Sequence, residues 1–140
     1  MKSLANFRDE VEDAIYTVLN VQSVRARATG GVWNTQVPKE IKPPWVEFQT
    51  FSKTDDYPTY TIRGVSGLYR ILAVSDSPYP KEATEIDSLV DAVMQNAALS
   101  MSSYSLLWCR RESDFSDNPN REGSMWTRQG GLWRIEADES

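Results

Sequence analysis

The 140-residue sequence contains no histidine. Histidine is the usual general base near neutral pH and the commonest metal ligand in proteins. Its absence rules out Ser-His-Asp and Cys-His catalysis, because both need an imidazole to take up a proton. Paired carboxylates are the remaining route to acid–base catalysis.

The chain has a single cysteine, Cys109, so it forms no internal disulfide and needs no oxidising compartment. Cys109 lies in an apolar, strand-like context, where cysteine usually behaves as a small buried hydrophobic residue. Nothing near it in the sequence would lower its pKa, as a nucleophilic cysteine requires. We therefore expect this side chain to have a packing role.

A run of basic residues is also missing, and the formal net charge is −5. The positive residues are scattered or come as short pairs such as Arg110-Arg111. A nucleic-acid-binding protein needs clustered positive charge to displace counterions from the phosphate backbone. Specific DNA or RNA binding is therefore not expected, although DNA could pass by without being captured.

No apolar run approaches the roughly 18 residues of a membrane span. The first 19 residues carry acidic side chains among the apolar ones, so they lack the continuous apolar core of a signal peptide. We expect no membrane contact, and a protein that is used in the cytoplasm or packed into something assembled there.

Three glutamates lie in strand-like segments, and two of Glu47, Glu112 and Glu136 could adjoin across a sheet as an acid–base pair. The simpler interpretation is that they are solvated surface acids near neighbouring arginines. The loop acids lack the full calcium-binding pattern, and the Gly-Gly pairs lack the context of a phosphate-binding loop. The sequence thus predicts no enzyme activity, no cofactor and no metal site.

The chain does contain enough apolar material for a single domain spanning residues 1–140. Hydrophobic residues make up 40% of it, and a chain of this size buries roughly 68% of its unfolded surface. Its five tryptophans and six tyrosines suit either core packing or subunit contacts, where tryptophan, tyrosine and arginine are enriched. The candidates for a contact surface are Trp45, Phe51, Tyr57, Tyr69, Ile71, Arg110, Arg111, Trp126, Arg128 and Trp133.

Two segments have the periodicity of amphipathic helices. Between residues 4 and 19 the apolar side chains fall on one arc at 3.6 residues per turn, with Asp9 and Asp13 away from it. A second helix is expected after Pro80, because proline suits the first turn, and its apolar arc reaches Ala97.

Strand patterns fill the rest of the chain. Residues 45–52 form a strand, and residues 68–75 carry apolar side chains on both faces, which indicates a central strand covered on both sides. Gly130-Gly131 is expected to mark a bend or bulge. Further strand-like segments are 59–63, 106–112, 125–128 and 132–137, and residues 114–123 are expected to be a polar loop.

The order is therefore helix, strands, helix, strands. Runs of strands with short connections favour an antiparallel or mixed sheet with helices on one face. We predict an α+β fold with an antiparallel or mixed sheet of about four to five strands and two main helices packed on one face.

This layout resembles the tail-terminator, or tail-completion, proteins of long-tailed bacteriophages. The first helix is followed by a variable stretch and a proline-led strand, Pro43-Pro44-Trp45-Val46-Glu47-Phe48. A strand then leads into a proline-started helix over residues 68–97. Finally, residues 106–112 lead into an aromatic-rich hairpin, residues 126–134. The resemblance lies in chain length, in the order of the elements and in their residue types, and it covers most of the chain.

The resemblance implies a structural virion protein that acts without a substrate. Members of that family form hexameric rings on the finished tail tube, stop further tube subunits from adding, and present a surface for the head. The implied partners are other copies of the chain, the tail tube protein and the head-completion or connector protein, with DNA passing through the ring. The implied location is the head-proximal end of the virion tail, with assembly in the host cytoplasm.

Two other interpretations stay open at this point. One is a head-completion or connector subunit of similar size on the portal side, which would hold DNA in the head. The other is a monomeric cellular module whose aromatic hairpin binds a ligand or peptide.

Overall fold

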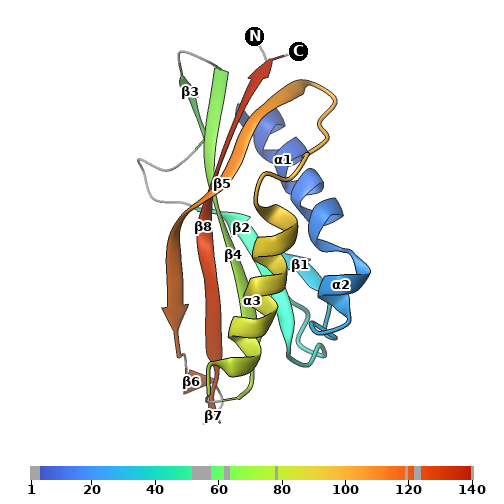
Figure 1. The fold of residues 1–140 in the computed structure, drawn as a ribbon, viewed down its shortest axis with the longest axis vertical. Helices are drawn as coiled ribbons and strands as arrows, with labels where there is room; N and C mark the ends of the chain where they lie inside the picture. The colour runs from blue at the N-terminus through green and yellow to red at the C-terminus, as the bar shows by residue number, and fades with distance from the viewer. Residues whose placement is uncertain are drawn as a thin grey trace.

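A six-stranded sheet carries two long helices on one of its faces (Figure 1). The computed structural model describes residues 4–51, 58–61, 64–77, 79–118, 120–121 and 124–139. The helices are α1 (Leu4–Leu19), α2 (Gln22–Arg25) and α3 (Lys81–Met94). The strands are β1 (Val32–Asn34), β2 (Trp45–Thr50), β3 (Thr59–Thr61), β4 (Gly64–Ser75), β5 (Tyr104–Asp117), β6 (Asn120–Arg121), β7 (Ser124–Met125) and β8 (Thr127–Glu139).

The sheet order is β1-β2-β4-β8-β5, with β3 pairing the first residues of β4. Only β1 and β2 run parallel among the described strand pairs of this sheet; the others are antiparallel. β6 and β7 form a separate two-stranded ribbon. The long strands β4 and β8 occupy the middle of the sheet, so they fix the positions of most side chains discussed below.

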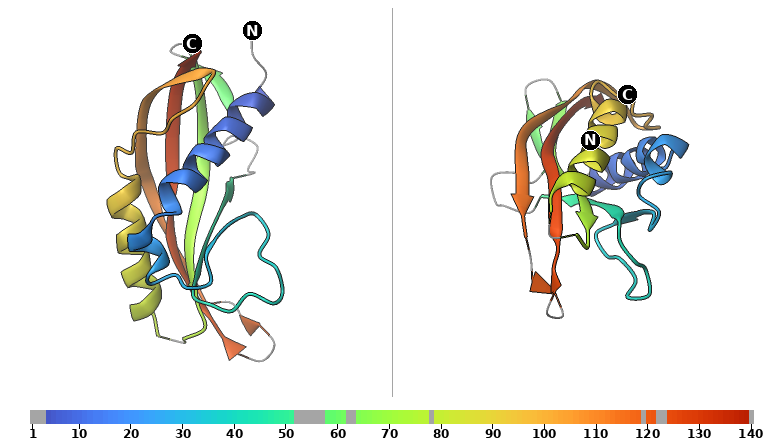
Figure 2. Two further views of the ribbon diagram at one scale, coloured as in Figure 1. Left: turned by 90° about the vertical axis from the view of Figure 1, so that its right-hand side faces the viewer. Right: turned by 60° about the horizontal axis from the view of Figure 1, so that its bottom comes forward.

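The hydrophobic core lies between the sheet and the helices. Figure 2 shows α1 and α3 in front of the sheet, on the same side. Phe7 and Ile15 of α1 and Ile86 of α3 are fully buried, as periodicity at 3.6 residues per turn requires. Their partners in the sheet come from alternate positions of β4 and β8, chiefly Tyr69, Ile71, Trp133 and Ile135, and all are at most 1% exposed.

The other face of the sheet has no helix over it in the described part of the chain; we call it the open face. Alternate residues of β4, including Leu68 and Val74, point towards it and are nevertheless buried. Long side chains from the neighbouring strands cover them. Arg134 lies opposite Leu68 in the register, and Arg128 lies opposite Val74, so their aliphatic stems shield apolar surface from water.

The α+β class with a mixed sheet and helices on one face is confirmed, with six strands in the sheet. β4 is central, as its two-sided apolar pattern predicted. The short helix α2 is additional to the two helices predicted from periodicity.

Two predictions about the C-terminal part were wrong. β5 continues to Asp117, into the segment expected to be a loop, because its polar residues pair with β8 as far as Arg128. The expected bend at Gly130-Gly131 does not occur, and β8 is one strand through this point. Glycine is needed there for a different reason: a Cβ at position 130 would lie 1.9 Å from the Ile71 carbonyl oxygen.

No helix in the described residues is long and apolar enough to cross a membrane.

Candidate functional site

The open face carries four arginines from three adjacent strands. Arg70 comes from β4, Arg128 and Arg134 from β8, and Arg110 from β5. The sheet register brings them together, since Arg70 pairs with Leu132 and Arg110 pairs directly with Arg134. Cationic side chains therefore run across the middle of the face, above the buried apolar residues of β4.

Two of these arginines are neutralised within the chain. The Arg128 Nε donates to Asp117 Oδ1 at 2.7 Å, and the Arg134 Nε donates to Glu112 Oε2 at 2.8 Å. The hydrogen bonds from Arg134 hold the pKa of Glu112 below its usual value, and the bond to Asp117 raises the pKa of Arg128. Both pairs are charge-assisted and geometrically specific.

The other two, Arg70 and Arg110, make no hydrogen bond and no ion pair with any residue that the structure describes. The Arg70 guanidinium lies 5.3 Å from the centre of the Phe115 ring, and Arg110 lies 3.4 Å from that of Trp108. Burial lowers the pKa of Arg70, and the nearby charge of Arg128 lowers it further. The charges of Glu47 and Asp117 oppose this lowering. Arg70 is thus a half-buried cation that lies over a ring, near two carboxylates but hydrogen-bonded to neither.

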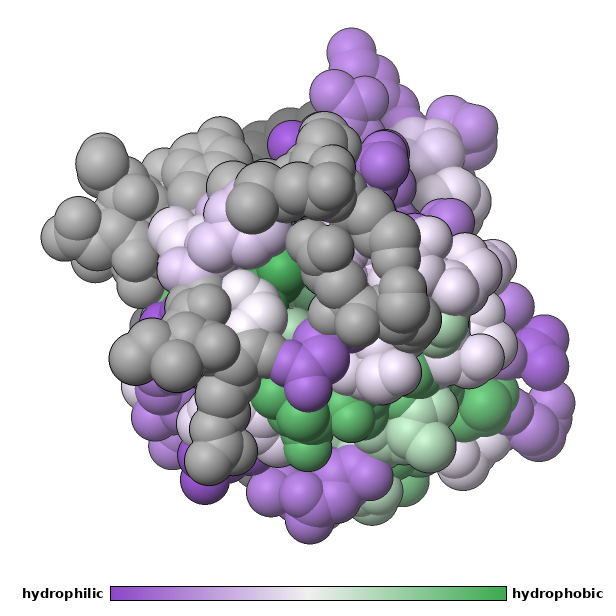
Figure 3. All heavy atoms as spheres, turned by 90° about the horizontal axis from the view of Figure 1, so that it is seen from above, coloured by the Kyte–Doolittle hydropathy of each residue, from purple (hydrophilic) through white to green (hydrophobic). Residues whose placement is uncertain are grey.

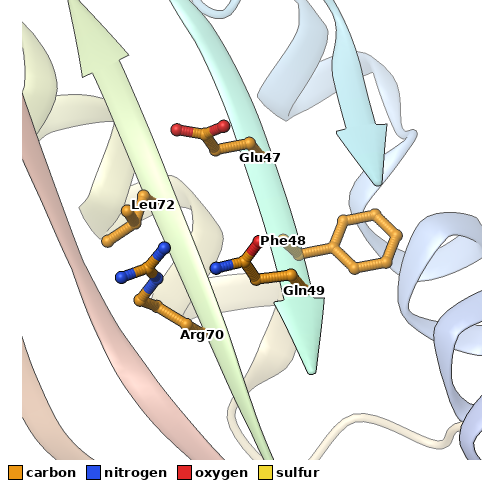
Figure 4. Close-up of a pocket in the computed structure, with 5 residues that line it drawn as sticks. All are labelled: Glu47, Phe48, Gln49, Arg70 and Leu72. Carbon is orange, nitrogen blue, oxygen red and sulfur yellow. The ribbon is translucent and has the colours of Figure 1, made fainter. Parts of the chain in front are cut away.

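Arg70 borders a small hollow between β2 and β4. Figure 4 shows its guanidinium beside Gln49, with Glu47 and Leu72 on the same side of the sheet, while Phe48 points the other way, towards the helices. This alternation follows from the pleat of β2. The hollow is too small for an organic ligand, but it leaves the Arg70 guanidinium open to a group approaching from outside.

A second hollow lies on the open face near the start of β5, lined by Leu107, Trp108, Arg110 and Glu136. Leu107 is 39% exposed, and the Trp108 Nε1 donates to Glu136 Oε2 at 2.5 Å. Viewed from the end of the molecule that holds both chain termini, hydrophobic side chains reach the surface between hydrophilic ones (Figure 3). Tryptophan and arginine are enriched among the residues that dominate protein–protein contacts.

A third feature is a groove of about 340 Å³ between the segment 37–43 and the start of β8. Trp45 and Trp126 meet edge to face in its wall, with ring centres 5.5 Å apart. The exposed lysines Lys39 and Lys42 border it. The buried Trp45 Nε1 has no hydrogen-bond partner in the described part of the chain.

The predicted contact residues fall into different environments. Arg110 and Arg128 lie on the open face, Trp45 and Trp126 line the groove, and Phe51 is half-buried at the end of β2. Tyr57 lies outside the described residues. The remaining predicted contact residues face the helical side of the sheet: Tyr69, Ile71 and Trp133 are fully buried in the core, and Arg111 is held by aspartates.

Arg111 therefore acts inside the chain. It contacts Asp87 through both terminal nitrogens, at 2.9 and 3.0 Å, and Asp114 through Nε at 2.8 Å. It also donates to the Gly130 carbonyl oxygen at 2.6 Å. Burial works to lower the pKa of Arg111, but these carboxylates outweigh it and raise the pKa. The side chain ties α3 to β5 and β8.

The candidate contact residues named from the sequence did not include Arg70, Phe115 and Trp108, which lie on the open face. Arg70 was detectable, because it is the one charged residue of the strand 68–75 and shares a face with Leu68 and Leu72. Phe115 was not, since it lies in the segment that was expected to be a loop.

The thiol and two of the three strand glutamates have defined environments among the described residues. Burial raises the pKa of the Cys109 thiol to about 12, the opposite of an activated nucleophile. Glu112 and Glu136 are engaged by Arg134 and Trp108 respectively. No group of three potential metal ligands occurs among the residues that the structure describes.

No protein-family model matches this chain, and no curated protein matches it in sequence. Similar folds do occur among solved structures. One is a chain in a structure described as the virion of a native gene transfer agent (GTA) particle; its TM-score is 0.72 at 15% identity, with 93% of this chain and 95% of that chain covered. Another aligns with a TM-score of 0.52 at 16% identity, covering 93% of this chain and 94% of its own. At these identities the likeness shows a shared fold.

Proposed function

We propose that this chain is a structural subunit of a phage-like virion and acts by assembling with other chains rather than by catalysis. The observation that carries the proposal is the fold shared, over nearly the whole of both chains, with a chain from a gene transfer agent virion. The open face supports it, because arginines without an ion pair lie beside half-buried aromatic rings and the exposed Leu107, which favours a protein contact over a small-molecule site.

Within the particle, we propose the role of a tail terminator. Copies of the chain would form a ring, hexameric as in the family that the sequence resembles, on the end of the tail tube. The ring would stop further tube subunits from adding and present a surface to the head-completion or connector protein. A closed ring needs two different, complementary patches on each copy. DNA would pass through its opening, which suits a chain with a net charge of −5.

Deleting the gene from the phage or particle that encodes it, and imaging the lysate by electron microscopy, tests this role. Overlong or unjoined tails beside filled heads are the expected result. Tails of normal length beside heads that have lost their DNA would show a connector on the portal side instead.

Complementation from a plasmid provides the control for that experiment. The wild-type gene should restore joined particles with tails of normal length. If the deletion instead yields intact, infectious particles, both virion roles are excluded, and the aromatic groove becomes the site to study.

A further inference from the structure

The acidic side chains of α1 fall into two sets. Glu10 accepts a hydrogen bond from the Ser103 backbone nitrogen at 2.8 Å, and Glu12 accepts one from the Thr50 hydroxyl at 2.9 Å. Asp9 and Asp13 instead point away from the chain's own sheet and are exposed. Asp9 has only a surface contact of 3.8 Å with the adjacent Arg8, which contributes little. The Asp13 carboxylate has no partner in the described residues.

The arginines of the open face divide in the same way. Arg128 and Arg134 are bound to carboxylates of β5, whereas Arg70 and Arg110 form no hydrogen bond or ion pair with the described residues. Glu47 and Asp117 act on Arg70, and Arg110 acts on Glu112, only through their charges. Arg70 is half-buried, so a hydrogen-bonded carboxylate would offset part of its desolvation cost, while Arg110 is exposed and accessible. The chain therefore presents two cations without an ion pair on one surface and two outward-facing anions on another.

The two surfaces lie on opposite sides of a two-layer structure, because α1 covers the face of the sheet that the arginines do not occupy (Figure 2). They cannot meet within one copy. Between copies they make a heterologous contact, in which a different patch of each chain is used, as a ring requires.

The spacing of the charges also allows the contact. By sheet geometry the Cα atoms of Arg70 and Arg110, two strands and two residues apart, are about 12 Å from each other. Asp9 and Asp13 are one helical turn, about 6 Å, apart on one side of α1. Two long arginine side chains can converge from either side onto such a helix. Tyr16, 43% exposed and next on the same side of α1, adds an apolar surface to face Leu107.

We propose that α1 of one copy docks on the open face of the next, with Asp9 and Asp13 pairing with Arg70 and Arg110. The inference rests on the proposed function for its premise that the chain self-assembles. The occupant of the open face is a second copy of this chain because the chain itself supplies the complementary charges.

The test is the self-association of the full chain, measured by sedimentation over a concentration series. The reversals Arg70→Glu with Arg110→Glu, and Asp9→Lys with Asp13→Lys, should each weaken association at least tenfold. All four substitutions in one chain swap the two partners and should bring association back to near the wild-type level. Such rescue is specific to residues that contact each other.

Matched variants separate this contact from general effects of charge and from misfolding. Lys39→Glu with Lys42→Glu removes the same charge at the groove, off both proposed surfaces, and should leave association unchanged. The neutral pair Arg70→Gln with Arg110→Gln should weaken association by less than the reversal, with an unchanged thermal unfolding transition.

Three results would overturn the inference: association of the Arg70/Arg110 reversal equal to that of wild type, loss confined to the lysine variant, or no rescue in the fourfold variant. A wild-type chain that stays monomeric, and gives no cross-linked dimer when Asp13→Cys and Arg110→Cys chains are mixed and treated with a bis-maleimide long enough to span an arginine–aspartate pair, would also overturn it. The gene deletion tests the proposed function separately from this contact. If the wild-type chain associates as expected but the deletion does not give overlong or unjoined tails, the terminator role is excluded and the contact between copies is retained.

Discussion

At the level of single residues, Arg111 and Arg70 show how partners decide what an arginine does. They lie on opposite faces of the same sheet, Arg70 in the central strand β4 and Arg111 in the edge strand β5. Arg111 is bound by Asp87 and Asp114 and bridges to the backbone of β8. Arg70 lies over a ring and is hydrogen-bonded to no carboxylate among the described residues, although Glu47 and Asp117 lie near it. The first arginine ties three elements together, and the second is the one that the proposed contact uses.

The Arg111 cluster leads to a stability prediction. Arg111→Met removes the cation from three carboxylates, those of Asp87, Asp91 and Asp114, of which Asp87 has a side chain only 15% exposed. Removing one partner of a fully buried pair costs about 3–5 kcal/mol, and we expect about 2–3 kcal/mol here because the cluster is partly solvated. Urea denaturation measures the loss. Arg25→Met, at an exposed position of α2, is the control and should stay within about 0.5 kcal/mol of wild type.

Glu112 gives a prediction about pH. Its pKa is lowered in the folded chain by Arg134, so this carboxylate stabilises the fold above its unfolded value of 4.5, and the contribution is lost as the pH falls through the lowered pKa. Since its side chain is 48% exposed, the contribution is at most about 1 kcal/mol. Glu112→Gln should be less stable than wild type at neutral pH and equal to it in acid. A difference that persisted in acid, or the same pattern in Glu40→Gln, would contradict this.

At the level of secondary-structure elements, the close approach of β8 to β4 depends on glycine. A Cβ at Gly130 would lie 1.9 Å from the Ile71 carbonyl oxygen and 2.8 Å from the Leu72 Cα. These are backbone atoms, so the clash could not be relieved by rotating a flexible side chain. Gly130→Ala should therefore push the two central strands apart and destabilise the chain by about 1–3 kcal/mol or more. Thermal unfolding measures this. Ser113→Ala, at an exposed position of β5, should have little effect.

The sequence predicts helices and strands well where burial of one or both faces produces a regular spacing of apolar residues. The apolar arc of α1 and the two-sided pattern of β4 correspond to the buried residues observed. It fails for the second half of β5, where Asp114, Ser116 and Asp117 are polar in a strand that lies at the edge of the sheet. Local composition cannot distinguish a solvated edge strand from a loop, because the pairing partner is far along the chain.

The candidate site shows the same limit more strongly. Aromatic residues indicated contact surfaces, yet Trp133 and Tyr69 lie in the core and Trp108 on the surface. Which face a strand residue occupies follows from register, and the bulge between Arg111 and Ser113 shifts that register midway along β5. The pairing of Arg134 with Glu112 at this bulge was therefore not deducible from alternation alone.

At the level of the whole molecule, the sheet presents cations on its open face and the helical layer presents anions on α1. This arrangement suits head-to-tail assembly. The net charge of −5 nevertheless makes copies repel one another. Repulsion between whole molecules acts over long distances and is removed by salt, since the screening length is about 10 Å at 0.1 M and about 3 Å at 1 M. Local pairs between Asp13 and Arg110 at the exposed part of the contact would be weakened by the same salt.

The direction of the salt effect on self-association therefore distinguishes the two kinds of contact. If carboxylates of α1 pair with Arg70 and Arg110, raising sodium chloride from about 0.1 M to about 1 M should weaken association, because repulsion is already largely screened at the lower value. A contact made mainly by apolar groups would be unchanged or strengthened. The Arg70→Gln/Arg110→Gln variant should lose the salt dependence along with part of its affinity, so sedimentation of both proteins at two salt concentrations decides which force holds the copies together.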